Sequence, residues 1–261
     1  MNSICIKFVC TLMMFIVLAG CEKTVEKEDS DLAIDPMAKV IVMPPEFASL
    51  AIDKTGGLEA WGKVRQLQLQ CIVTFYDVNA GYYLTEQKVD VFPWSDSIVI
   101  AGTELRKAYK WQLSRGKFDI LQGTGQLSNF KNQIPSSYFA EAILDIVTAP
   151  VRFMDKSFVY ARNSTEVNIQ GRLCYPIKID KSSGNVSNNN TVFYQNKADS
   201  RIDMALLTNT SDDTSFLVCG YDYNEINDKG ILVPNRIEIY LADENGIVQR
   251  QLFRIDVSSS K

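Results

Sequence analysis

The chain has 261 residues, with 27 basic and 31 acidic side chains and a formal net charge of −4. This acidic balance argues against nucleic-acid binding, which needs a basic face. Histidine is absent from the sequence, which excludes Ser-His-Asp and Cys-His catalysis, histidine metal ligation and the commonest general base near neutral pH. No phosphate-binding P-loop sequence occurs either, so we expect neither an enzyme nor a bound cofactor.

The first 20 residues have the pattern of a secretory signal peptide. One charged residue, Lys7, precedes an apolar run over residues 8–18 that ends in the small pair Ala19-Gly20. A signal peptide combines a positive start, about 7–15 apolar residues and a small-residue exit, whereas a membrane-spanning helix needs about 20 apolar residues. The sequence therefore predicts that residues 1–20 are cleaved.

Leu18-Ala19-Gly20-Cys21 resembles the lipobox of bacterial lipoproteins. The resemblance implies cleavage before Cys21 and attachment of diacylglycerol to its sulfur. Each buried CH₂ contributes about 0.8 kcal/mol, so two or three acyl chains would hold the protein on a membrane without a spanning helix. Glu22 after the cysteine favours the periplasmic face of the outer membrane over the inner membrane. An ordinary secreted protein whose signal happens to end near a cysteine is the alternative.

Residues 21–40 are charged and poor in aromatic side chains, so they cannot bury enough apolar surface to offset the entropy lost on ordering. We interpret them as a flexible acidic tether. Residues 41–261 show no fixed-period repeat and no second domain boundary, and are predicted to form one domain.

This domain begins with a short helical pattern over residues 46–54, stopped by Gly56-Gly57. The period then changes to two at residues 67–76, whose odd-numbered side chains are apolar. Further short strand patterns follow to the end of the chain, and Asn245-Gly246 marks a late hairpin. The spacing predicts a meandering antiparallel sheet.

One segment interrupts the strands. Residues 134–150 carry apolar side chains at helical spacing, with Ser136 or Ser137 as a candidate N-cap and Pro150 as a predicted stop. The only charges, Glu141 and Asp145, are four residues apart and therefore share one stripe. The rest of the circumference is apolar, so the helix should pack deeply or cover an apolar surface.

Three cysteines lie in the predicted domain, at positions 71, 174 and 219. Their spacing does not suggest a metal site. Cys71 alternates with apolar residues and is predicted to be buried, and one disulfide between two of the three remains open.

The order of elements, with "GGLEAWGKVRQLQLQCIVTF" near the start and "GYDYNEINDKGILVPNRIEIYLADENG" near the end, resembles the LolA/LolB-like lipoprotein-carrier superfamily. The likeness covers roughly residues 47–257. It implies a mainly β (α+β) fold, in which a curved antiparallel sheet of about eleven strands forms a half-open barrel covered by short helices. It also implies an apolar cavity for acyl chains of lipids or lipoproteins, without catalytic residues.

On this resemblance, aromatic and apolar residues near the predicted helix and strands are candidates for the cavity and its lid. They are Phe92, Trp94, Tyr109, Trp111, Tyr138, Phe139, Ile143, Ile146 and Val147. The alternative is that they form ordinary core without a cavity.

The leading functional hypothesis is a monomeric, lipid-anchored envelope protein that binds acyl chains or lipoproteins without catalysing a reaction. The alternative is a structural or protein-interaction lipoprotein with the same fold and no cavity. A third reading, a carboxylate-based hydrolase, would rest on acidic residues with no assigned role. These are Glu104, Asp119, Asp212, Asp213 and Asp222.

Overall fold

The computed structural model describes residues 45–77, 79, 81–104, 106–126, 134–154, 159–180, 189–209, 212–226 and 229–260. All of them belong to one compact unit of the chain. The predicted signal peptide (1–20), Cys21 and the tether to residue 40 lie outside the described residues, and these expectations stay predictions.

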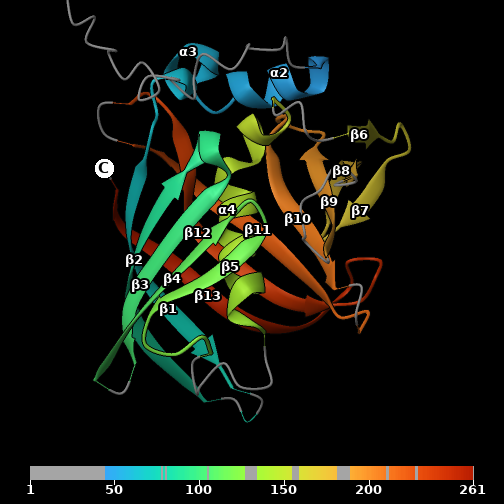
Figure 1. Ribbon diagram of the computed structural model, residues 1–261. Coiled ribbons are helices and arrows are strands. Elements are labelled where there is room, and N and C mark those ends of the chain that lie inside the picture. The colour runs from blue at the N-terminus through green and yellow to red at the C-terminus, as the bar shows by residue number, and fades with distance from the viewer. Residues whose placement is uncertain are drawn as a thin grey trace, which may run out of the picture. The chain divides into compact units, whose positions relative to one another are not determined.

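Thirteen antiparallel strands form a single curved sheet (Figure 1). They are β1 (Leu67–Tyr76), β2 (Tyr82–Phe92), β3 (Ser97–Glu104), β4 (Lys107–Ser114), β5 (Lys117–Gln122), β6 (Val159–Arg162), β7 (Val167–Ile169), β8 (Arg172–Asp180), β9 (Asn189–Asn196), β10 (Ile202–Asn209), β11 (Ser215–Glu225), β12 (Leu232–Ala242) and β13 (Val248–Ser260). The predicted mainly β fold is confirmed. The count exceeds eleven because the short strands β6 and β7 pair with successive parts of β8.

The sheet is an open meander rather than a closed barrel. Its strands pair in the order β5-β4-β3-β2-β1-β13-β12-β11-β10-β9-β8-β6, so β5 and β6 lie at opposite ends. Register shifts such as the one between Gln70 and Cys71 help the sheet to curve. The chain between β5 and β6 must therefore cross from one end of the sheet to the other, and it does so through helix α4 on the concave side (Figure 1).

Two short helices, α2 (Glu46–Asp53) and α3 (Gly57–Gly62), precede the sheet. Gly56 between them has φ 117°, and a Cβ there would lie 2.2 Å from the carbonyl oxygen of Gly230. Only glycine fits this backbone conformation and this close approach, which explains the predicted helix stop. None of the helices in the described ranges is long and apolar enough to cross a membrane.

Helix α4 (Ser136–Arg152) runs two residues past its predicted stop, because Pro150 lies inside its last turn and does not end it. Pro150 has no N–H to donate to the carbonyl of Ile146, so the helix continues without that hydrogen bond. Pro135 occupies the N-cap position without a side-chain hydrogen bond, so neither Ser136 nor Ser137 caps the helix as predicted.

Strand β1 shows how the sequence pattern builds the main core. Its odd-numbered residues are buried and its even-numbered residues are partly or fully exposed, because successive side chains on a strand point to opposite faces. The buried side chains of the concave face join those of α2, α3 and α4 in one cluster, which we call the inner core.

Strands β10 and β11 behave differently, because residues 202–207 and 215–220 are buried without alternation. Their second face packs in a smaller cluster on the opposite side of the sheet, which we call the outer cluster. Its buried members are Ile169, Cys174, Tyr194, Met204, Leu206, Leu217, Cys219 and Ala242. The turn at Gly246 closes over it, because a Cβ at this glycine would lie 3.3 Å from Ile169.

Candidate functional site

The concave face gathers most of the residues predicted to line a cavity. Six of them are nearly inaccessible members of the inner core, with exposed fractions of 0–2%: Tyr109, Trp111, Phe139, Ile143, Ile146 and Val147. Trp94 and Tyr138 are partly buried and pack against this core. Phe92 is half-buried and follows the inward-facing Val91, so alternation places it on the other face.

Helix α4 occupies the concave face. Every residue from Phe139 to Arg152 is buried, and the helix contacts β3, β4, β10, β11 and β12. The ring of Phe139 lies edge-on to that of Phe253 in β13, with 5.3 Å between centroids. The described apolar residues therefore contact one another, as the deep-packing prediction for this helix required. An open acyl-chain cavity is not seen among them.

The charged stripe of α4 is buried with the rest of the helix. Asp145 is fully buried and forms an ion pair of 2.7 Å with Arg152, which also binds Asp96 at 2.7 Å. Asp96 follows the 3₁₀ helix η3 (Pro93–Ser95), so this network ties the end of α4 to the β2–β3 connection. Removing one partner of a buried pair costs about 3–5 kcal/mol.

The indole N–H groups point to packing roles for the tryptophans. Trp94 donates to the carbonyl of Trp61 at 3.2 Å, and Trp111 donates to the carbonyl of Thr124 at 2.7 Å. Buried polar groups with partners stabilise a fixed position, so both side chains form part of the folded framework.

Gln87 and Tyr109 carry polar groups that are buried at the inner core. The amide of Gln87 and the hydroxyl of Tyr109 interact with each other, and neither makes a hydrogen bond to another described residue. Burial raises the pKa of Tyr109. Gly102 makes room for this ring, because a Cβ there would lie 2.5 Å from the tyrosine oxygen.

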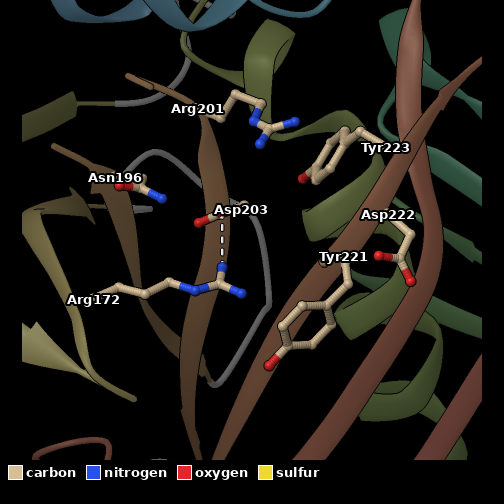
Figure 2. A pocket seen from close by; sticks show the side chains of 8 residues that line it. Arg172, Asn196, Arg201, Asp203, Tyr221, Asp222 and Tyr223 are labelled. Carbon is tan, nitrogen blue, oxygen red and sulfur yellow. Dashed lines mark hydrogen bonds and ion pairs between the residues drawn. The ribbon is translucent and has the colours of Figure 1, made fainter. Parts of the chain in front are cut away.

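A polar pocket of about 220 Å³ lies on the opposite side of the sheet (Figure 2). Strands β10 and β11 pair only as far as Met204 and Cys219, and beyond this point β11 continues with β12 alone. The pocket occupies the divergence of the two strands. Its lining comes from β8, β9, β10, β11 and the β9–β10 turn, and comprises Arg172, Asn196, Arg201, Asp203, Gly220, Tyr221, Asp222 and Tyr223.

A β-bulge aims Asp203 into this pocket. The register between β9 and β10 pairs Ile202 with Gln195 and Met204 with Tyr194, which leaves Asp203 as the extra residue. One carboxylate oxygen forms an ion pair with Arg172 at 2.9 Å, drawn as a dashed line in Figure 2. Burial raises the pKa of Asp203 to about 6, and the nearby arginine opposes this shift.

Among the carboxylates of the hydrolase reading, only Asp222 lines the pocket. Asp222 pairs with Arg236 at 3.2 Å, whereas Asp203 pairs with Arg172. Asp119 instead pairs with Lys117 on β5, and Asp212 accepts a hydrogen bond from the Thr214 amide. The structure therefore does not bring the five named carboxylates into one site.

This pocket was not among the sites predicted from the sequence. An acidic residue within the apolar run of residues 202–207 was the available signal, because buried carboxylates are rare without a partner. Arg172 and Tyr221 carry no comparable pattern, since each lies in an ordinary strand sequence.

All three cysteines are free and buried. Burial raises the pKa of Cys71 and Cys219 to about 12, and that of Cys174 to about 11. The burial predicted for Cys71 is confirmed, and no disulfide joins these three residues. The described residues contain no cluster of three or more potential metal ligands.

No known protein family and no curated protein matches the chain. Among solved structures, a LolA superfamily protein from Nitrosomonas europaea aligns over 84% of this chain and 94% of its own, with TM-score 0.53 and 11% identity. A putative outer membrane lipoprotein-sorting protein domain from Vibrio parahaemolyticus covers 83% and 90%, with TM-score 0.45 and 8% identity. A DUF1329 family protein from Desulfovibrio piger covers 82% and 91%, with TM-score 0.44 and 11% identity. The first likeness shows that this domain has a LolA-like fold.

Proposed function

We propose that this chain is a non-enzymatic, lipid-anchored protein of the cell envelope whose domain binds acyl chains of lipids or lipoproteins. The observation that carries the proposal is the arrangement of the concave face. An open, curved sheet carries one continuous apolar cluster, and α4, which is apolar around most of its circumference, lies across it.

For an acyl chain to bind on this face, α4 must move away from part of the sheet. An acyl chain that replaces Ile143 or Phe139 against the sheet exchanges one apolar contact for another, so the hydrophobic contribution changes little. During this movement, the ion pairs of Arg152 with Asp145 and Asp96 would keep the C-terminal end of the helix in place. The helix would therefore act as a movable cover that fills the face when no ligand is present.

Two buried polar groups of the inner core support the same proposal. Gln87 and Tyr109 interact only with each other among the described residues, which leaves part of their hydrogen-bonding capacity unused. The Tyr109 hydroxyl and the Gln87 amide could both donate to the carbonyl of an acyl ester or amide. A ligand with an acyl chain and a carbonyl head would satisfy the apolar face and these donors together.

The anchor rests on the sequence. Cys21 and the apolar run before it support attachment to a membrane, and the acidic tether supports a domain held away from the lipid surface. Glu22 favours the periplasmic face of the outer membrane. We propose a monomer that does not bind nucleic acid, in keeping with the net charge of −4.

One observation favours the alternative of an interaction module without a ligand cavity. The concave face is occupied by α4, whose residues from Phe139 onward are all buried. If α4 never moves, this face serves stability alone, and any partner must bind elsewhere.

A fatty-acid binding assay separates acyl-chain binding from the interaction module. We use the full chain carrying Cys21→Ser, because it has no covalently attached acyl chain that could compete with the added ligand. We expect a fluorescent fatty-acid analogue to bind at micromolar concentration. Ile143→Ala should change its Kd by at least about fourfold, the effect of about one buried methylene.

Leu217→Ala is the matched control, since Leu217 is equally buried but belongs to the outer cluster. It should leave the Kd for the analogue unchanged while it lowers stability to a similar degree. If the folded, delipidated chain binds no analogue at micromolar concentration, the interaction module becomes the better reading.

The anchor is tested separately. The wild-type chain should incorporate radioactive palmitate and fractionate with membranes, and Cys21→Ser should do neither. A Cys21→Ser chain that still sediments with membranes would show that the lipobox interpretation is wrong.

A further inference from the structure

The polar pocket between β10 and β11, which we call the outer pocket, contains groups whose hydrogen bonds the protein itself does not complete. Asp203 is 3% exposed, and Arg172 binds its Oδ2. The side-chain amide of Asn196 lies close enough to lower the pKa of this carboxyl, but Oδ1 makes no well-formed hydrogen bond among the described residues. A buried carboxylate oxygen whose hydrogen bonds are incomplete is costly, so this atom is prepared to accept a hydrogen bond from a molecule in the pocket.

Donors lie on the other side of the same pocket. Arg201 uses Nε and Nη2 for Asp199, at 2.8 and 2.5 Å, and Nη1 has no acceptor among the described residues. The hydroxyl of Tyr223 likewise makes no hydrogen bond among those residues, and its ring lies 4.6 Å from the Arg201 guanidinium carbon. Figure 2 shows both groups above Asp203, at the upper end of the pocket.

The backbone is shaped for this arrangement. Gly220 lacks the Cβ that would lie 2.9 Å from the Tyr223 hydroxyl and 3.4 Å from Ile146 of α4. Asp222 has φ 52°, a conformation that non-glycine residues adopt only infrequently. Together with the bulge at Asp203, these features cluster at the pocket, as irregular backbone commonly does at binding sites.

The lining charges exclude several classes of ligand. A simple anion would meet the buried carboxylate of Asp203, and a simple cation would meet Arg172 and Arg201. A sugar would need a free aromatic face, but guanidinium groups lie 4.6–5.0 Å from the rings of Tyr221 and Tyr223. An acyl chain does not suit a lining this polar.

Size narrows the ligand further. Pockets for drug-sized molecules measure about 300–1,000 Å³, and this one measures about 220 Å³. We propose that the outer pocket binds a small zwitterion of amino-acid size, whose ammonium group donates to Asp203 Oδ1 and whose carboxylate accepts from Arg201 Nη1 and the Tyr223 hydroxyl. This site is separate from the proposed acyl-chain site and does not depend on it.

Calorimetric titration of the full chain in detergent with glycine, L-alanine and β-alanine tests the site. Methylamine and acetate, which carry one charge each, are the ligand controls. We expect at least one zwitterion to bind with a Kd of about 1 mM or tighter, and both single-charge controls to bind at least tenfold more weakly.

Two variants remove opposite halves of the site. Asp203→Asn and Arg201→Gln should each weaken zwitterion binding about tenfold or more, the usual effect of losing a charged hydrogen-bond partner. Asp256→Asn, on the exposed surface of β13, is the matched control and should bind as the wild type does. Circular dichroism checks that each variant is folded, and Arg201→Gln stands in if Asp203→Asn does not fold.

The proposal is overturned if none of the three zwitterions binds at 10 mM, a limit about tenfold above the expected Kd. Equal affinity for methylamine or acetate would also overturn it, as would undiminished binding by both folded pocket variants.

Discussion

Strands β1 and β11 belong to one sheet but are buried in different ways. In β1, buried and more exposed residues alternate, and Ile72 on the water-facing side is 40% exposed. In β11, the first six residues are all buried, because the inner core covers one face and the outer cluster the other. The half of the sheet that contains β10 and β11 therefore has two packed layers, and the half that contains β1 has one.

The difference explains where the outer pocket forms. A strand covered on both faces can hold a carboxylate away from water, as β10 holds Asp203. Charged residues of the singly covered half remain in contact with water, as do Arg254 and Asp256 of β13, whose side chains are 41% and 38% exposed. Burial disfavours the charged form of a side chain, and here the second packed layer is what buries Asp203 on β10.

The largest expected effect is a direct test of the second packed layer. Leu217→Ala should lower the free energy of unfolding by about 2–5 kcal/mol, the usual cost of truncating a buried leucine. Ile72→Ala on the water-facing side of β1 should change it by no more than about 0.5 kcal/mol. Urea unfolding followed by circular dichroism measures both, and equal small effects would show that the outer cluster is not a core.

The second prediction concerns pH. The pKa of Asp203 is about 6 in the folded protein and 3.8 ordinarily, so between these values the folded state keeps a proton that the unfolded state has released. The free energy of unfolding, relative to that of Asp203→Asn, should therefore fall as pH rises from about 4 to about 6, by on the order of 2 kcal/mol.

Denaturant unfolding at a series of pH values measures this difference, which cancels the contribution of other carboxylates. Asp256→Asn, from the singly covered half, should retain the wild-type profile. A wild-type profile parallel to that of Asp203→Asn throughout this pH range would contradict the burial of the carboxylate.

The smallest expected effect compares cysteines on the two sides of the sheet. Cys71 lies in the inner core and Cys219 in the outer cluster, and both are 3% exposed or less. Serine at either position should cost about 1–3 kcal/mol, because burying a hydroxyl costs more than burying a thiol. Both thiols should also react slowly with a thiol reagent at pH 8, since burial raises their pKa values.

Mass spectrometry after timed labelling locates the modified residue. Fast labelling of Cys219 with slow labelling of Cys71 would indicate that the outer cluster opens independently of the inner core.

The strands were predictable because their patterns are local. Alternation in residues 67–76, the Asn245-Gly246 turn and the apolar run of residues 134–150 each identify an element without knowledge of its neighbours. The resemblance added the architecture. Eight of the nine proposed cavity residues do meet at the inner core, and Phe92 does not, because it is one residue out of phase with Val91.

The outer pocket was not predictable, because no sequence pattern reports where two paired strands diverge. Its residues come from four strands and the β9–β10 turn, and Arg172 and Asp203 are 31 positions apart. Asp203 faces the pocket only because a bulge shifts the register at that position. Such a site depends on long-range pairing rather than on local periodicity.

The sequence by itself determined the class of the fold, the buried faces of its alternating strands, the absence of histidine chemistry and the predicted lipid anchor at Cys21. These follow from composition and short-range order, which act within a few residues. Only the tertiary structure decided that α4 fills the concave face, that β10 and β11 are covered twice and that Asp203 meets Arg172. Those outcomes depend on how the curved sheet brings distant segments together. The burial of a side chain and its pKa are set by these long-range contacts, which local sequence patterns do not specify.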